Sequence, residues 1–179
     1  MVNERSEKGQ AVKLPPDMAQ ALAKMKPGVI SKDGFLGDDD RPLPEIISDQ
    51  HAACLRRGVT CEAIADAMRR VGRAGLAGFG APISVEEKWE VTADENRGKL
   101  ACPWPHPGMF QKTVYTVKSL RTGRAVRFTE LSIHLVEKHC FFEGAGAVFY
   151  NDPEALIDVL ELTRSDELPE VPNLTGVES

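Results

Sequence analysis

The sequence predicts an α+β fold in which an N-terminal αα-hairpin packs on a small antiparallel sheet and helices return at the C-terminal end. Three observations predict this class. Apolar residues follow a helical period over residues 40–71. Two-residue alternation, broken by turn signals, occupies residues 83–128. Helix signals then return over residues 129–139 and 152–161.

The chain of 179 residues is long enough for one ordinary domain with its own core. We expect that domain over residues 35–162, with the helical hairpin in 35–80 and the sheet with its associated site in 81–162. Residues 1–34 are polar and rich in turn formers, which predicts a mobile N-terminal arm. Residues 163–179 have neither helix nor strand period, which predicts a disordered acidic tail.

Charge and hydropathy narrow the class of partner and the compartment. The formal net charge of -5 opposes a main role in coating nucleic acid or an anionic membrane, since both need a positive field. The N-terminus is charged, and no segment approaches the roughly 20 apolar residues that span a bilayer. We therefore expect a cytoplasmic protein without a membrane segment.

In a reducing compartment, cysteines are expected to be thiols or metal ligands rather than disulfides. A disulfide between Cys54 and Cys61, which come close across a helix turn, is accordingly the less favoured alternative. The chain has four cysteines in all: Cys54, Cys61, Cys102 and Cys140.

The helices of the first half are delimited by caps. A short helix from Asp17 to about Lys26 is the one candidate element in the N-terminal arm. The next helix begins near Asp40 and ends at Gly58. Thr60 then caps a second helix, so the pair forms an αα-hairpin that requires a partner surface.

Strand signals start at Ile83 and run through Val91 to a predicted turn over residues 94–98. Residues 113–117 and 125–128 then form two strands of a hairpin around an Arg-Thr-Gly-Arg turn.

Two further helices are expected after this hairpin. The first runs from about Thr129 to His139 and ends before a glycine-rich loop. Asp152 caps the last helix, with Pro153 at its first position.

The most chemically specific feature is a set of four potential metal ligands, arranged as two close pairs that flank the hairpin. Cys102 and His106 lie on a proline-rich turn with three residues between them, whereas His134 and His139 lie on the following helix with four between them. A structural zinc site needs four soft or borderline donors, commonly as two close pairs on different elements. The knuckle–hairpin–helix order therefore resembles a zinc finger and predicts one zinc ion per chain.

This prediction depends on where the second helix ends. Residues five apart on an ideal helix point about 140° away from each other. His134 and His139 reach one ion only if the helix ends or unwinds near His139. Residues 140–144 have the composition of a helix terminus, which agrees with that condition.

Three alternatives remain open at the level of sequence. In the first, the protein binds no metal and the four residues have unrelated roles, with Cys102 as a small buried residue and His139 as a cation at a helix end. Alternatively, three donors bind a catalytic metal in a hydrolase, with Glu137 or Glu143 as general base. A metal-free nucleophile, Cys102 or Cys140 beside a histidine, is the third. Cys140 is also a substitute ligand if His134 points into the core.

Nucleic acid is an unfavoured partner. Basic residues do lie on the hairpin, but only four residues precede His134 in its helix, which leaves almost no surface to read bases in a groove. A protein or small-molecule ligand is the favoured partner class. The hairpin cations are Lys112, Lys118, Arg121, Arg124 and Arg127.

A resemblance adds context. Phe35-Leu36-Gly37, the turn from Cys102 to Gly108, and the segment from Ile133 to Gly144 are similar to those of an uncharacterised family of small bacterial cytosolic proteins. The resemblance spans about residues 35–161 and implies a bacterial cytoplasmic origin without an activity. Together with the donor spacing, it leads us to expect a zinc-binding protein with a structural metal site and a binding or regulatory role.

Overall fold

The structure, a computed structural model, describes residues 13–164 as an α+β fold with a four-stranded antiparallel sheet. The sheet is a meander in the order β1-β2-β3-β4, formed by β1 (Ile83–Val85), β2 (Trp89–Ala101), β3 (Met109–Ser119) and β4 (Ala125–Thr129). Within the described residues, no helix is long and apolar enough to cross a bilayer. The predicted tail over 163–179 lies outside the described part of the chain except for its first two residues.

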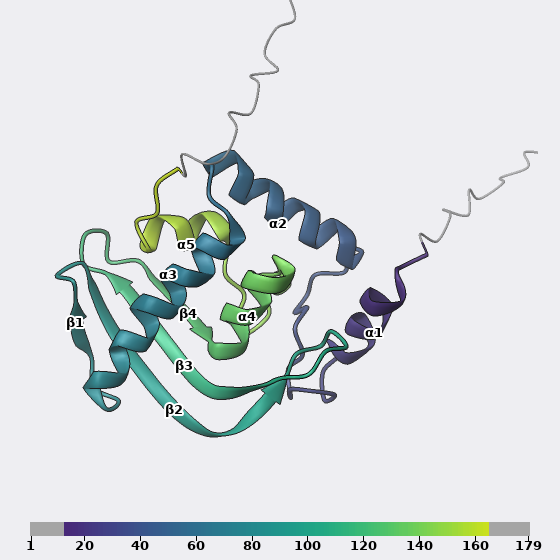
Figure 1. Cartoon of the computed structure of the whole chain (residues 1–179), viewed down its shortest axis with the longest axis horizontal. Helices are drawn as coiled ribbons and strands as arrows, with labels where there is room; N and C mark the ends of the chain where they lie inside the picture. Colours follow the sequence, from purple (N-terminus) through teal and green to yellow (C-terminus); the bar gives the residue numbers. More distant parts are fainter. Residues whose placement is uncertain (1–12, 165–179) are drawn as a thin grey trace, which may run out of the picture.

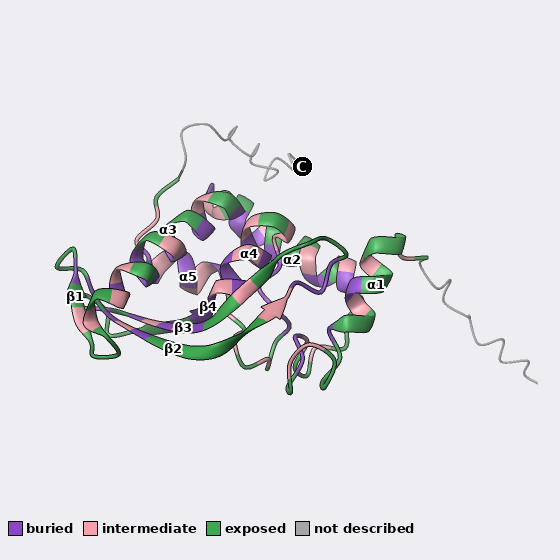
Figure 2. Ribbon diagram, turned by 60° about the horizontal axis from the view of Figure 1, so that its bottom comes forward, coloured by how far each residue is buried: buried purple, intermediate pink, exposed green. Residues whose placement is uncertain are grey.

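Helices cover one face of this sheet, as Figures 1 and 2 show. Their bounds are α1 (Pro16–Lys24), α2 (Leu43–Arg57), α3 (Cys61–Ala74), α4 (Glu130–His139) and α5 (Pro153–Val159), with a 3-10 turn over Gly75–Gly78. Strand β2 alternates accordingly: Trp89, Val91 and Ala93 are buried beneath the helices, whereas Glu90 and Asp94 face solvent.

Most predicted helix boundaries are confirmed because local side chains fix them. Thr60 accepts a hydrogen bond from the Ala63 N–H, and Asp152 accepts one from the Ala155 N–H. Gly58 ends α2 in the left-handed conformation, with φ of 66°. Thr129 forms a reciprocal capping box with Ser132 at the start of α4.

The predicted turn over residues 94–98 is wrong. Strand β2 continues through it to Ala101, paired with β3 along its length. The turn-forming residues produce instead an irregularity of register between Asn96 and Lys99, where Gly98 has φ of 101°. The strands β2 and β3 therefore form one long, curved ribbon, whose tip reaches towards α1 in Figure 1.

Helices α2 and α3 follow one another as predicted, but their packing as an αα-hairpin on the sheet is not confirmed. Helix α3 lies on β2 and β3, whereas the main partner of α2 is α5. Helix α2 spans two hydrophobic clusters instead. Its residue Cys54 belongs to a large cluster between α3, α5 and the sheet, which we call the sheet core, as do Ile64, Trp89, Phe128 and Leu156.

The second cluster, which we call the tip core, lies between α1, the start of α2, the ribbon tip and α4. It is formed by Ala21, Met25, Phe35, Leu43, Ile46, Cys102, Trp104, Leu131, Leu135 and Phe141. The predicted mobile arm over residues 1–34 requires correction at α1, and its residues 1–12 lie outside the described part of the chain. Ala21 and Met25 are 0% exposed, so α1 packs onto the domain. The short apolar face of α1 is buried because the ribbon tip supplies a surface that the sequence did not reveal.

Candidate metal centre

The four predicted donors come together at the ribbon tip. Their ligand atoms all lie within 4.8 Å of one another. Cys102 and His106 come from the turn between β2 and β3, and His134 and His139 come from α4. Cys102 is buried, the two helical histidines are half-buried, and His106 is exposed. These residues form a group that could hold a metal ion.

The nitrogen and sulfur atoms meet at short distances. His106 Nε2 lies 3.1 Å from His134 Nε2 and 3.3 Å from His139 Nε2. Cys102 Sγ lies 3.5 Å from His139 Nε2. Around one tetrahedral zinc ion, the usual bond lengths place two nitrogens about 3.3 Å apart and a sulfur about 3.6 Å from a nitrogen. The observed distances match those of a ligand set.

Hydrogen bonds alone account poorly for this arrangement. The Nδ1 of His106 lies 3.0 Å from the Pro107 carbonyl oxygen, which only accepts, so Nδ1 carries the proton and donates it. The Nε2 of neutral His106 is then a lone pair directed at two other Nε2 atoms. This tautomer is the one that binds a metal through Nε2, with the second ring nitrogen oriented by a carbonyl.

The helix end satisfies the condition set by the ligand spacing. Helix α4 ends at His139, and Cys140 follows in the left-handed conformation with φ of 47°. His134 and His139 therefore approach the same point although they are five residues apart, and their ring centroids lie 5.4 Å from each other. The prediction that the helix ends near His139 is confirmed.

Both ends of α4 are anchored, which fixes the two histidines. At its N-terminus, Glu130 accepts two hydrogen bonds from Arg73 of α3, at 2.9 and 2.8 Å, and a third from the Tyr115 hydroxyl. Beyond its C-terminus, the buried Gln50 of α2 donates to the Glu143 carbonyl at 2.7 Å and accepts from the Phe142 N–H at 3.0 Å. The donors are thus held in place by contacts beyond the site itself.

Aromatic rings flank the histidines. Trp104 stacks on His139 with centroids 4.0 Å apart and planes 8° from parallel. Phe110 lies against His134 with centroids 4.4 Å apart. These contacts limit rotation of both imidazoles. The sequence pattern does not assign these roles, although the position of Trp104 between the first two donors indicates that its ring lies near them.

The protonation state suits metal binding. Burial, with the nearby His106, lowers the pKa of His134 to about 4. Burial and the two neighbouring histidines lower the pKa of His139 to about 4. Burial raises the pKa of the Cys102 thiol. Both imidazoles are therefore neutral and available as ligands at neutral pH, while the thiol would lose its proton on binding a cation.

The two candidate general bases are engaged elsewhere. Glu137 pairs with Arg69 at 2.8 Å. Glu143 is 5% exposed and lines two small cavities, with Phe149 in both, that include none of the four donors. Burial raises the pKa of Glu143 to about 8, against the opposing hydrogen bond with the Phe149 main chain. The ion pair of Glu137 and the separate cavities of Glu143 give no support for base catalysis at the metal centre.

The cysteines differ from the sequence-based prediction. Cys61 and Cys140, 79 residues apart in sequence, form a disulfide with their Cα atoms 5.6 Å apart. Cys140 is therefore not a substitute metal ligand at the tip. The sequence suggests only the nearby pair Cys54 and Cys61 for a disulfide. Cys61 and Cys140 meet only in the folded chain, where the start of α3 lies at the end of α4.

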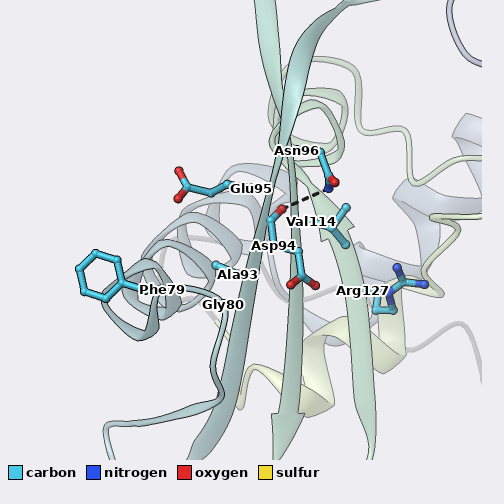
Figure 3. A pocket seen from close by; sticks show the side chains of 8 residues that line it. All are labelled: Phe79, Gly80, Ala93, Asp94, Glu95, Asn96, Val114 and Arg127. Carbon is cyan, nitrogen blue, oxygen red and sulfur yellow. Dashed lines mark hydrogen bonds between the residues drawn. The ribbon is translucent and has the colours of Figure 1, made fainter.

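A larger hollow lies elsewhere, along the middle of β2. It is an open depression of about 680 Å³. Figure 3 shows that its charged side chains do not converge: Glu95 points to the side of Phe79, whereas Asp94 lies on the side of Arg127. We assign no site to this depression.

Comparison with known proteins gives no further assignment. No family model, curated protein or solved structure matches the chain. Function must therefore be argued from the centre itself.

Proposed function

We propose that Cys102, His106, His134 and His139 bind one zinc ion as a structural centre. The observation that carries this proposal is the convergence of three Nε2 atoms and one Sγ at separations of 3.1, 3.3 and 3.5 Å. The single lone pair of His106 Nε2 can accept from only one of its two Nε2 neighbours, whereas one cation is bound by all three nitrogens. These contacts favour the metal-bound over the metal-free alternative.

The donor types favour zinc. A thiolate with three imidazoles suits a borderline-soft cation and does not suit magnesium or calcium, which prefer oxygen. Four protein donors complete a tetrahedral shell, as in structural rather than catalytic zinc sites. A hydrolase with an open zinc position is the weaker candidate, because Glu137 is paired with Arg69 at 2.8 Å and Glu143 faces other cavities.

The zinc ion would fasten the ribbon tip to α4. Without it, the turn that carries Cys102 and His106 is attached to α4 mainly through the small tip core. A metal between the two elements would make closure of the ribbon, and docking of α1 on it, depend on zinc. The centre would thus shape the surface at this end of the domain.

We infer a binding or regulatory role for that surface in a bacterial cytoplasmic protein, with a protein or small molecule as partner. Nucleic acid is a weaker candidate because two of the five hairpin cations are paired with carboxylates. Arg121 contacts Glu161 at 3.3 Å, and Arg124 contacts Asp158 at 3.7 Å. These pairs, with the net charge of -5, support a non-nucleic-acid partner.

Cobalt substitution tests the zinc proposal. The zinc ion of the full chain is exchanged for Co²⁺, and the visible and near-ultraviolet absorption is recorded. We expect the strong d–d bands of tetrahedral cobalt together with a sulfur-to-cobalt charge-transfer band. Cys102→Ser should remove the charge-transfer band, whereas the control Cys54→Ser should keep it. Weak octahedral bands in the wild-type chain would contradict a closed four-ligand site.

A further inference from the structure

A second group of sulfur atoms lies away from the tip, where three helices meet. Cys54 comes from α2, Cys61 is the first residue of α3, and Cys140 directly follows α4. The three Sγ atoms lie within 4.8 Å of one another. Cys61 and Cys140 form the disulfide, and the Cys54 Sγ lies 3.9 Å from the Cys61 Sγ. A disulfide needs only two of these residues.

The third thiol is buried in an apolar environment. Cys54 is 0% exposed and Cys61 is 5% exposed, and both belong to the sheet core with Val59 and Phe142. Burial raises the pKa of the Cys54 thiol to about 11. Cys54 is therefore a neutral thiol that contacts the disulfide and is a poor nucleophile towards it at neutral pH.

A cleft leads from solvent to the disulfide. Its volume is about 340 Å³, and its lining includes Cys61 and the half-buried Cys140 together with Glu62 and Glu137. An external dithiol that enters this cleft would attack Cys140, form a mixed disulfide and release the Cys61 thiol. Its second thiol would then release Cys140. The dithiol is oxidised to its disulfide, and the protein gains two electrons and two protons as two thiols.

The reduced centre has the donor number and spacing of a metal-binding site. Sulfurs bound to one ion through bonds of about 2.3 Å lie about 3.4 to 4.0 Å apart, the shorter distance belonging to pyramidal three-coordinate ions. The Cys54–Cys61 separation of 3.9 Å already matches this spacing. Once the disulfide is opened, a rotation of the half-buried Cys140 side chain would place the third sulfur at a similar distance.

The surroundings favour an ion whose complex with the three thiolates carries no net charge. Three thiolates bound to a divalent ion carry a net charge of -1, whereas three thiolates bound to a trivalent ion are neutral. A net negative complex would be costly in the apolar sheet core. A trivalent, thiophilic ion of three-coordinate geometry fits these constraints best.

We propose that Cys54, Cys61 and Cys140, once reduced, form a three-thiolate site for a trivalent thiophilic ion of the arsenic(III) class. Binding is a condensation without redox change: As(OH)₃ and three thiols give As(SR)₃ and three waters. The disulfide state closes the site, because two of its three sulfurs are then bonded to each other. This site has no ligand in common with the zinc centre, so the two proposals can be tested separately.

Arsenite titration of the full, zinc-loaded chain tests this proposal. The disulfide is reduced with a phosphine, which introduces no competing thiol, and the excess is removed without oxygen. We expect one arsenic per chain in native mass spectrometry, with Cys54, Cys61 and Cys140 protected from alkylation. The unreduced chain should bind none. The reduced chain should still contain only one zinc, because a divalent ion is disfavoured at this centre.

A variant tests the role of the third sulfur. Cys54→Ser should weaken arsenite binding at least tenfold, because it leaves two sulfurs, whereas Ser48→Ala, at an exposed position of the same helix, should leave it unchanged. Circular dichroism checks that both variants fold, and protection of Cys54 in the wild-type chain gives a second reading that needs no variant. Unchanged binding by Cys54→Ser, or an alkylated Cys54 in the arsenite-bound wild type, would overturn the proposal.

Discussion

The two hydrophobic clusters of the domain are held together in different ways. The sheet core packs long apolar side chains of α3, α5 and the sheet against one another, including Trp89, Phe128 and Ile64, which are almost fully buried. The tip core is smaller and includes one of the proposed zinc ligands, Cys102, and a ring stacked on another, Trp104. We infer that burial, with the Cys61–Cys140 disulfide, maintains the sheet core, whereas the tip core depends on the proposed zinc ion.

The largest expected effect comes from removing a ligand. His139→Ala should abolish zinc retention and lower the melting temperature by about 6 to 15 °C, a loss of several kcal/mol for a domain of this size. Hydrogen exchange should rise in α1 and the ribbon tip before it rises in α3. The matched control is His51→Ala, which removes an exposed histidine outside the centre and should change neither property. Equal zinc content in both variants would contradict the ligand assignment.

A substitution in the sheet core should show the opposite pattern. Ile64 is 0% exposed, so Ile64→Ala removes buried contacts and should cost about 2 to 5 kcal/mol of unfolding free energy in denaturant titration. Zinc content should stay unchanged under native conditions. Leu55→Ala, at a position that is 40% exposed, is the control and should cost far less. Loss of zinc from the folded Ile64 variant would show that the two clusters are not separable.

The hydrogen bonds of Gln50 should contribute less to the free energy of unfolding than the buried side chain of Ile64. Gln50→Ala leaves the Glu143 carbonyl and the Phe142 N–H without their partner, at an expected cost of about 2 kcal/mol. Because these contacts fix the segment after α4, we also expect weaker zinc binding in competition with a chelator. The exposed Gln20→Ala serves as control. A Gln50 variant as stable as this control would remove Gln50 from the support of the centre.

A further expected effect depends on pH. The pKa of Glu143 is raised by burial to about 8, so this carboxyl stabilises the fold below its unfolded pKa and loses that contribution as pH rises towards 8. Glu143→Gln should therefore melt higher than wild type at pH 8 to 9 and similarly at pH 5. The exposed Glu45→Gln should show no such gain. A gain independent of pH would point to packing rather than to charge.

The sequence predicted what short-range chemistry determines. The caps at Thr60 and Asp152 were correct, as was the helix start near Thr129, because each side chain bonds a main-chain group three residues away. The predicted caps at Asp17 and Asp40 were wrong, because the N-caps of α1 and α2 are Pro15 and Pro42. The four donors were also predicted correctly as a group, because their spacing on a turn and a helix end restricts how they meet. The ion itself, and its zinc identity, stay a prediction.

Long-range contacts were missed. The turn signals at residues 94–98 were overridden by pairing with β3 along the ribbon, which only the full sheet provides. The apolar face of α1 looked too short to dock, because the ribbon tip that covers it lies far away in sequence. The Cys61–Cys140 pair likewise depends on α3 and α4 lying side by side.

The most direct test of the zinc centre is the metal content of the full chain purified without chelators. We predict about one zinc per chain, and a marked fall in melting temperature when EDTA removes it. Less than about 0.2 zinc per chain, together with unchanged melting in EDTA, would contradict the account.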